Sequence, residues 1–362
     1  MATTDERRAL TLKIALGSLG LVGTTAAVWY LRQRAPTAET SVSPGTSANA
    51  PTTPTAETKQ GGFLQAIGNT KLIELPSLSK LTKCRVLGKC EYLNPGGSSK
   101  DRIAKGILLD AIQKGHIKVP VDSSDAVPTV VEGTSGSTGI SLALASRALG
   151  FNCIVYMSSD ISPEKSKLLE QFGAEVRRVE PASFASPGHY VNMARTAAAQ
   201  MDNGFFADQF EHPANHQCHY DGIGAELWAQ TKGTVDVLIS GAGTGGTIAG
   251  AGRYLRERKP EVLICLSDPQ GSGLATRVNH GILYTKEMQE NRVKRHRTDT
   301  IVEGVGLCRL TYNFAQALDE TKCGIDRGYT VTDQDAVTMS RWLLQNDGLY
   351  LGSSSALNCC AA

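Results

Sequence analysis

The stretch that decides the fold of this 362-residue sequence reads Asn94-Pro95-Gly96-Gly97-Ser98-Ser99-Lys100-Asp101-Arg102. Its Pro-Gly-Gly triplet cannot continue a strand or a helix, so it predicts a sharp turn. The two serines after the turn suit a helix N-cap, and the apolar spacing from Arg102 to Gln113 predicts an amphipathic helix. Lys100 is therefore expected in the first turn of a helix, where free amides and the positive end of the helix dipole favour an anion.

Lys100 has two interpretations on this stretch alone. In the first, it is a solvated lysine at the start of a helix, in a place where a cation adds little stability. In the second, the side chain lies in a partly dry pocket that lowers the pKa of its amine, so that the amine can form a Schiff base.

The pattern beyond this helix indicates an α/β fold. Short apolar runs alternate with amphipathic helices, which is typical of a parallel sheet flanked by helices. We expect strands at 85–92, 129–132, 153–157, 235–240 and 262–267, and helices at 140–149 and 163–172. Right-handed crossovers bring the loops after these strands to one edge of the sheet, where ligands bind.

Two glycine-rich loops follow predicted strands. Thr134 to Gly139 mixes hydroxyl residues with glycines at a helix N-terminus and offers N–H groups to a carboxylate or a phosphate. In the second loop, Gly241 to Thr247, the glycine spacing satisfies a dinucleotide fingerprint, and Asp268 ends the next strand where a ribose-binding acid is expected. The hydroxyls of Thr244 and Thr247 favour a phosphate monoester instead.

Composition limits the partners. A net charge of +2, from 37 basic and 35 acidic residues, gives no indication of a nucleic-acid partner, and the basic cluster 292–297 is typical of a solvated loop. Nine scattered cysteines without a Cys-x-x-Cys pair favour neither a disulfide framework nor structural zinc, and fit a reducing compartment. His212, His216 and His219 would face one way on a helix, but Pro213 and the lack of a further ligand pattern argue against a metal.

The lysine stretch resembles a known motif. Asn-Pro-Gly-Gly-Ser-x-Lys-Asp-Arg is similar to the lysine loop of the pyridoxal 5'-phosphate (PLP) enzymes of the cysteine synthase and cystathionine β-synthase family, and further matches follow in the family's order from Gly61 to the end. The resemblance implies a fold-type II, tryptophan synthase β-like enzyme with two parallel-sheet α/β subdomains and the cofactor between them. Lys100 would bind PLP as a Schiff base and act as the catalytic base.

The resemblance also assigns cofactor and substrate ligands. Gly243, Thr244, Gly245, Gly246 and Thr247 would hold the phosphate, and Ser354, or else Ser355, would give a hydroxyl to the pyridine nitrogen. Thr134, Ser135, Gly136 and Thr138 would bind the substrate carboxylate, joined by Gln209 from an Asp-Gln-Phe stretch followed by Asn215; Gln209 is otherwise a polar residue at a strand end. Ser137 stands where the family has an asparagine that bonds the ring oxygen, so a shorter side chain would replace that contact.

The implied reaction is β-replacement. An activated serine of the O-acetylserine type and sulfide would give L-cysteine through an aminoacrylate. Cystathionine β-synthase chemistry and serine or threonine dehydration are alternatives, as is a weakly active, membrane-tethered PLP-binding protein. A nicotinamide oxidoreductase built on the second glycine loop would leave the lysine loop unexplained. Fold analogy suggests a homodimer.

The N-terminal part has its own organisation. After a tail at 1–12, residues 13–34 form an expected transmembrane anchor, because 14–31 carry no charge and span about 27 Å as a helix. A cleaved signal peptide is the competing interpretation. Residues 35–60, rich in Ala, Thr, Ser and Pro, predict a flexible linker. The anchor with basic flanks resembles signal-anchors of the mitochondrial outer membrane, which some fungal cysteine synthase-like proteins carry. Residues 61–362 would form the catalytic domain, shortened at its C-terminal end relative to the family.

Overall fold

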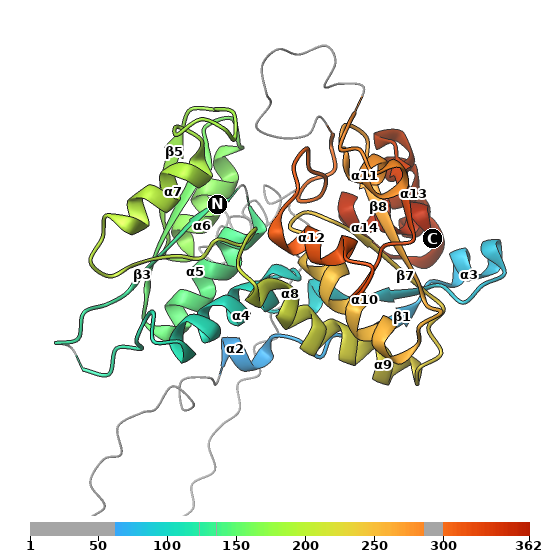
Figure 1. Ribbon diagram of the computed structural model, residues 1–362, viewed down its shortest axis with the longest axis horizontal. Helices are drawn as coiled ribbons and strands as arrows, with labels where there is room; N and C mark the ends of the chain where they lie inside the picture. Colours follow the sequence, from blue (N-terminus) through green and yellow to red (C-terminus); the bar gives the residue numbers. More distant parts are fainter. Residues whose placement is uncertain (1–61, 123, 135, 286–299) are drawn as a thin grey trace, which may run out of the picture. The chain divides into compact units, whose positions relative to one another are not determined.

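The first of two parallel sheets is formed by the chain that follows the lysine helix. In the computed structural model, which describes residues 62–122, 124–134, 136–285 and 300–362, this sheet has the order β5-β4-β3-β6. Its strands are β3 (Thr129–Gly133), β4 (Asn152–Ser158), β5 (Glu175–Val179) and β6 (Gly204–Phe206). The helices around it are α4 (Lys100–Gln113), α5 (Ser137–Leu149), α6 (Pro163–Gln171) and α7 (Tyr190–Ala199) (Figure 1). The side chains of Ile103, Ile107 and Leu108 on α4 join the buried core beside Val130 and Val155.

The second parallel sheet carries the other glycine loop. It has the order β7-β8-β9, with β7 (Val237–Gly241), β8 (Leu263–Pro269) and β9 (Arg327–Val331). The helices that accompany it are α10 (Gly246–Arg258), α11 (Leu274–His280), α12 (Tyr312–Leu318), α13 (Asp333–Asp347) and α14 (Ser353–Ala361). A separate apolar cluster, with Ile248, Leu255, Ile264 and Phe314 at its centre, fills this half. Two parallel-sheet α/β subdomains are therefore confirmed, each with its own core.

The predicted strand at 85–92 is wrong in length and in pairing. β2 covers only Leu87–Lys89 and pairs antiparallel with β1 (Leu72–Glu74), so these two strands stand outside both parallel sheets. The chain turns early because Glu91–Leu93 form a 3₁₀ turn, in which the Asn94 side chain donates to the Glu91 carbonyl at 2.8 Å. That turn prepares the Pro-Gly-Gly bend.

The remaining predicted elements are found with small changes at their ends. The helix expected at 140–149 begins at Ser137, and the strand expected at 235–240 covers Val237–Gly241. Short helices complete the chain: α2 (Phe63–Ala66), α3 (Pro76–Thr82), α8 (Ala214–His219), a π-helical turn at Tyr220–Gly224, and α9 (Ala225–Thr231). α8 packs against α4 and against α10, so it links the two subdomains.

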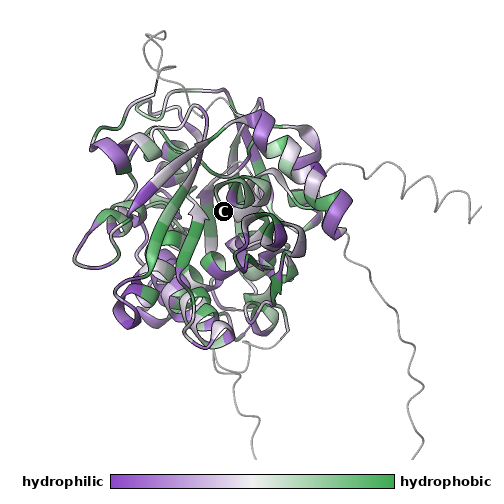
Figure 2. Cartoon of the chain, turned by 90° about the vertical axis from the view of Figure 1, so that its right-hand side faces the viewer, coloured by the Kyte–Doolittle hydropathy of each residue, from purple (hydrophilic) through white to green (hydrophobic). Residues whose placement is uncertain are grey.

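Hydropathy follows this arrangement. Figure 2 shows apolar residues on the strands and polar residues on the outer turns of the helices. Within the part of the chain that the structure describes, no helix combines the length and the apolar character needed to cross a bilayer. The predicted tail at 1–12, the anchor at 13–34 and the linker at 35–60 all lie outside the described residues.

Candidate active site

The lysine loop is held in shape by Asp101, the residue after the lysine. Its buried carboxylate accepts the Gly96 N–H at 2.6 Å and the Ser141 hydroxyl at 2.6 Å, so it joins the Pro-Gly-Gly bend to α5. A Cβ at Gly96 would lie 2.3 Å from this carboxylate, which explains the glycine. Of the two serines expected to cap α4, Ser98 accepts the Lys100 N–H at 3.2 Å, whereas Ser99 occupies the N-cap position without a side-chain bond.

Lys100 is half-buried in the first turn of α4. Burial lowers the pKa of its amine, and the negative charge of Glu91 partly opposes that effect. A desolvated lysine has a larger fraction of neutral, nucleophilic amine at neutral pH. This environment favours the partly dry pocket over the solvated lysine.

The first glycine loop meets Gln209 as the sequence predicts. The Thr138 hydroxyl donates to the Gln209 side-chain oxygen at 2.6 Å, and both side chains are buried. Glu132, at the end of β3, accepts the N–H groups of Gly133 at 2.9 Å and Gln209 at 3.1 Å. The backbone of the loop and the backbone of Gln209 are thus tied to one buried carboxyl group. Sequence reasoning missed Glu132.

The other predicted residues of this loop have different environments. Thr134 is buried at the end of β3, Gly136 precedes α5, and Ser137 is exposed as the first residue of that helix. Ser135 lies outside the described residues.

The second glycine loop forms a cradle that only glycine permits. A Cβ at Gly243 would lie 2.1 Å from the Gly304 carbonyl oxygen, and one at Gly246 would lie 1.9 Å from the Asn215 side-chain oxygen. Gly245 has a φ of +87° and packs against Phe314, so a side chain there is excluded by both space and conformation. The loop leads directly into α10, whose first amide groups have no helical acceptor. A phosphate monoester fits such a cradle.

The two threonines of this cradle are contacted from the segment that contains α8. Asn215 donates to the Thr244 hydroxyl oxygen at 3.0 Å and to the Gln209 carbonyl at 2.6 Å. His219 lies 3.2 Å from the Thr247 hydroxyl. Asn215 was predicted only as part of a motif match, and its spacing of four residues from His219 is the signal that places both on one face of α8.

The three histidines considered for a metal have separate partners. His216 lies 3.0 Å from the Asn313 amide oxygen, His212 faces Asp110 at 3.8 Å, and His219 bonds Thr247. His212 precedes α8, so the three imidazoles do not lie on one helix. Among the described residues, no group of three or more His, Cys, Asp or Glu side chains is arranged to hold a metal ion.

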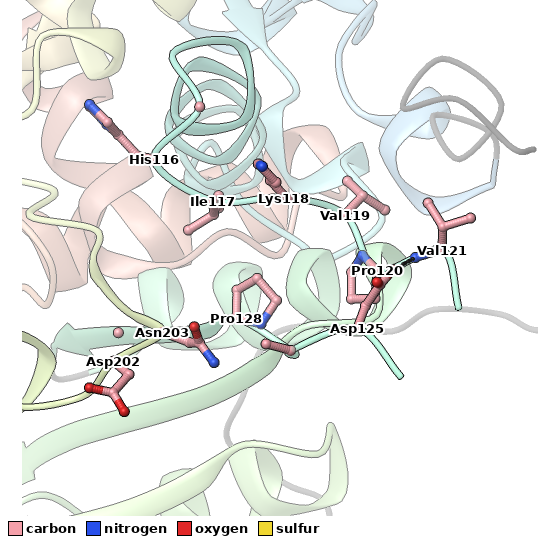
Figure 3. Close-up of a pocket in the computed structure, with 13 residues that line it drawn as sticks. His116, Ile117, Lys118, Val119, Pro120, Val121, Asp125, Pro128, Asp202 and Asn203 are labelled. Atoms are coloured by element: carbon pink, nitrogen blue, oxygen red, sulfur yellow. Dashed lines mark hydrogen bonds between the residues drawn. The ribbon is translucent and has the colours of Figure 1, made fainter. Parts of the chain in front are cut away.

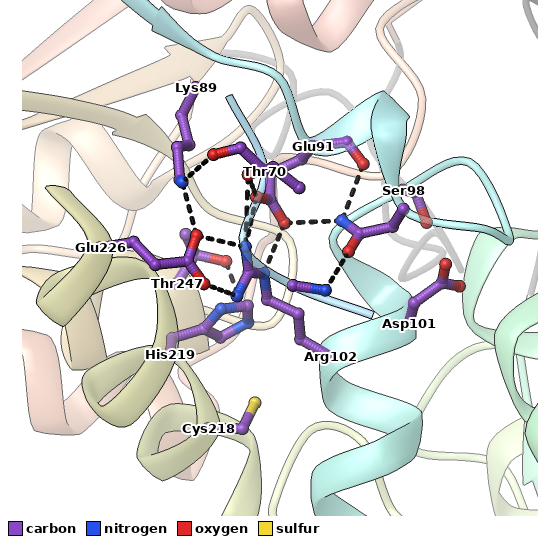
Figure 4. A network of polar contacts seen from close by, with 12 residues as sticks. Thr70, Lys89, Glu91, Ser98, Asp101, Arg102, Cys218, His219, Glu226 and Thr247 are labelled. Carbon is purple, nitrogen blue, oxygen red and sulfur yellow. Dashed lines mark hydrogen bonds and ion pairs between the residues drawn. The ribbon is translucent and has the colours of Figure 1, made fainter. Parts of the chain in front are cut away.

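His219 is a buried histidine that contacts the cradle. Burial lowers the pKa of this imidazole well below its ordinary value, and the positive charges of Arg102 and Lys100 lower it further. Figure 4 shows His219 and Thr247 beside Arg102, at the start of α4.

A network of ion pairs and hydrogen bonds surrounds Arg102 on the lysine helix (Figure 4). Sequence reasoning missed this network. Arg102 binds Glu91 through Nε at 2.8 Å and Glu226 through Nη1 at 2.7 Å. Lys89 bonds Glu226 at 2.5 Å, and Asn94 bonds Glu91 at 2.9 Å. The network joins the turn before the lysine loop to α9, and its members Arg102 and Glu226 are 124 residues apart in the sequence.

Arg309 is a further residue without a sequence signal. Its guanidinium lies over the rings of Phe184 at 4.1 Å and Phe210 at 4.6 Å, and it pairs with Glu211 at 2.9 Å. Phe210 is the neighbour of Gln209, so Arg309 holds the residue beside the predicted carboxylate ligand.

Ser354 lies in the first turn of α14, which begins at Ser353. The helix is docked by two bonds: Ser267 donates to the Leu357 carbonyl at 2.8 Å, and Asn358 accepts the Gly241 N–H at 2.7 Å. This packing at the start of the second glycine loop explains why so short a helix forms.

A separate pocket lies beside the first sheet, away from the predicted site residues (Figure 3). Its lining includes His116 and Lys118, which follow α4, Pro128, which precedes β3, and Asn203, which precedes β6. The pocket therefore lies at the amino ends of these two strands. None of the predicted site residues lines it.

The fold and the site together define a class of protein. A lysine whose amine has a lowered pKa suits an aldehyde, and the glycine cradle suits a phosphate monoester, so the residues present fit PLP. The protein is an α/β, fold-type II PLP enzyme. The chain belongs to the family of pyridoxal-phosphate dependent enzymes, whose family model matches residues 63–362.

Known proteins agree with this assignment. The chain is 48% identical over 303 residues to cysteine synthase 2 of Schizosaccharomyces pombe, a match that covers 82% of this chain and 74% of that protein. It is 44% identical over 308 residues, 83% of this chain and 76% of the relative, to a Saccharomyces cerevisiae protein whose name provisionally describes a mitochondrial cysteine synthase. The crystal structure of O-ureido-L-serine synthase superposes with a TM-score of 0.69 at 27% identity, covering 83% of this chain and 85% of the other.

Proposed function

We propose that this enzyme forms L-cysteine from an activated serine of the O-acetylserine type and sulfide. In this reaction the Cβ–O bond breaks, acetate leaves, and a new Cβ–S bond forms, so no external oxidant or reductant is needed. One arrangement carries the proposal: the segment 209–219 bonds Thr138 of the first glycine loop and both threonines of the cradle. Lys100, whose amine pKa is lowered, begins the helix that packs against α8 in this segment. The names of the similar proteins support the choice of substrates.

Each predicted residue receives a role in this proposal. Lys100 would hold PLP through its amine and would be the base that removes the proton from the substrate Cα. PLP, when bound, withdraws electrons from Cα. The cradle, 243–247, binds the phosphate with backbone N–H groups and two hydroxyls. The Ser354 hydroxyl would bond the pyridine nitrogen of PLP, and Ser137 would take the place of the residue that bonds the ring oxygen.

The substrate is held by its carboxylate. Thr134, Ser135, Gly136 and Thr138 would supply backbone N–H groups and the free hydroxyls of the first glycine loop. Gln209, whose side-chain oxygen accepts the Thr138 hydroxyl, would add its amide N–H groups. These donors orient Cα toward Lys100 and exclude water from the reacting atoms.

The replacement of Lys100 tests this function. Lys100→Ala is expected to abolish cysteine formation from O-acetylserine and sulfide, and to remove the visible absorbance of the PLP–lysine bond. Lys105→Ala is the matched control, because Lys105 lies on the same helix and bonds the Leu64 carbonyl at 2.9 Å. A Lys100→Ala protein that keeps the visible band would show that another amine holds the cofactor.

The same assay separates the other functions. A wild-type protein that binds PLP but makes no cysteine would be a binding protein. Conversion of serine with homocysteine would identify cystathionine β-synthase chemistry, and release of pyruvate or 2-oxobutyrate would identify a dehydratase. Each of these results contradicts the proposal.

We further propose that residues 13–34 anchor the enzyme in the mitochondrial outer membrane and that 35–60 are a flexible tether. Residues 61–362 would form the catalytic domain, which would be a homodimer in a reducing compartment. The uncharged run at 14–31 supports an anchor. No disulfide joins any of the nine cysteines, all of which lie among the described residues, and this suits a reducing environment. Alkaline carbonate extraction of mitochondria that contain the full chain should leave it in the membrane pellet. Release into the supernatant, or a mature protein that starts beyond residue 34, would contradict the anchor.

A further inference from the structure

Asn215 connects the two halves of the candidate site through a single side-chain amide. It is fully buried in α8, and its nitrogen contacts the Gln209 carbonyl at 2.6 Å and the Thr244 hydroxyl at 3.0 Å. A carbonyl oxygen only accepts hydrogen bonds, so the amide atom that faces Gln209 must be the nitrogen. The amide orientation is therefore fixed by chemistry. The same NH₂ group must donate to Thr244.

This orientation determines what the Thr244 hydroxyl can do. Its oxygen accepts one hydrogen bond from Asn215 and a longer one, at 3.4 Å, from the Gly246 N–H. A hydroxyl has two acceptor lone pairs and one hydrogen, so its hydrogen must point away from both donors. The Thr244 carbonyl is already held by the Thr311 hydroxyl at 2.7 Å, which fixes the backbone of the residue. The Thr244 hydroxyl can therefore donate a hydrogen bond to a ligand whose facing atom is an acceptor.

We propose that Asn215 is a positioning residue that makes Thr244 a hydrogen-bond donor to the phosphate of PLP and, through the same amide, holds the carbonyl of Gln209. This inference rests on the proposed function, because it takes the cradle at 243–247 to be the phosphate site. A phosphate dianion accepts hydrogen bonds but donates none, so a threonine whose hydrogen already faces the ligand needs no reorientation on binding. Asn215 acts only through its neighbours.

A double-mutant cycle with two ligands tests this. Asn215→Ala, Thr244→Val and the double variant are compared for binding of PLP and of pyridoxal, which lacks the phosphate, by equilibrium titration of the visible band. Each single variant should weaken PLP binding by about tenfold, as expected for one charge-assisted hydrogen bond. The double variant should be no weaker than Thr244→Val within about twofold, because both changes remove the same interaction. Pyridoxal binding should change by less than about twofold.

The control and the contrary results are distinct. Asn346→Ala removes an exposed asparagine that bonds the Trp342 carbonyl at 2.9 Å, and it should leave both affinities unchanged. Equal losses for PLP and pyridoxal in Asn215→Ala, or multiplied losses in the double variant, would overturn the role of Asn215. If wild-type protein itself binds no PLP, the proposed function fails instead. Should Asn215→Ala not fold, judged by circular dichroism, Asn215→Ser carries the same comparison.

Discussion

Replacement of Glu226 by glutamine should destabilise the fold by an amount that the structure allows us to work out. The Glu226 carboxylate accepts hydrogen bonds from Arg102 at 2.7 and 2.9 Å, from Lys89 at 2.5 Å and from the Asn69 N–H at 3.0 Å. Its side chain is only 15% exposed. Glu226→Gln keeps the shape and removes the charge.

The magnitude follows from the pKa of Glu226. Burial alone would raise this pKa, but the hydrogen bonds from Arg102 and Lys89 outweigh burial and lower it from 4.5 to about 2. At about 1.4 kcal/mol per pH unit, this corresponds to about 3 kcal/mol of stability at neutral pH. The figure agrees with the roughly 3–5 kcal/mol that breaking a buried ion pair costs.

The pH dependence has a definite sign. A carboxylate whose pKa is lower in the folded state stabilises the fold at every pH above its unfolded value, and this contribution is lost as the pH falls toward the folded value. The difference between wild type and Glu226→Gln should therefore stay constant from pH 8 to pH 6. It should shrink below a pH of about 4.5.

Urea unfolding followed by tryptophan fluorescence measures this difference. Glu257→Gln is the matched control: its carboxylate pairs with Arg253 at 2.8 Å on the surface of α10 and is 38% exposed, so its loss should cost no more than about 1 kcal/mol. A Glu226→Gln protein within about 1 kcal/mol of wild type at pH 7 would show that the network around Arg102 does not stabilise the lysine helix.

Two more predictions concern the glycine loops and their supports. Burial raises the pKa of Glu132 from 4.5 to about 8, although the hydrogen bonds from Gln209 oppose this effect. Wild-type stability should therefore fall as the pH rises from about 5 to 8. Glu132→Gln should remove this pH dependence, and urea midpoints with an unchanged pH dependence would refute the assignment. Gly246→Ala should weaken PLP binding by at least about tenfold, because the new Cβ would lie 1.9 Å from the Asn215 amide oxygen, whereas Gly352→Ala, with open space around it, should bind PLP like wild type in the same titration.

Local chemistry explains why so much of the site could be predicted from the sequence. The lysine loop, the Thr134 loop and the cradle at 243–247 each lie within one strand–turn–helix unit, where glycines, hydroxyls and the helix start determine the conformation together. These units formed where the sequence placed them, to within a few residues. The strand is shorter than the predicted 85–92 because Glu91 and Asn94 bond within the network around Arg102 and not within a sheet.

The missed residues depend on contacts between distant parts of the chain. Arg102 reaches Glu226 across 124 positions, and Arg309 reaches Glu211 across 98. A charged residue in a predicted helix gives no sign of whether it will be solvated or buried, because only the tertiary fold brings the partner. His219 shows the same limit, since its spacing was compatible with a metal but its partner is a threonine of the cradle.

The segment 209–219 explains how two sheets with separate cores can hold one ligand. It belongs to neither sheet, yet Gln209 bonds the loop of the first sheet, and Asn215 and His219 bond the cradle of the second. The proposed carboxylate and phosphate sites are therefore joined by one short piece of chain, which packs against the lysine helix and against α10.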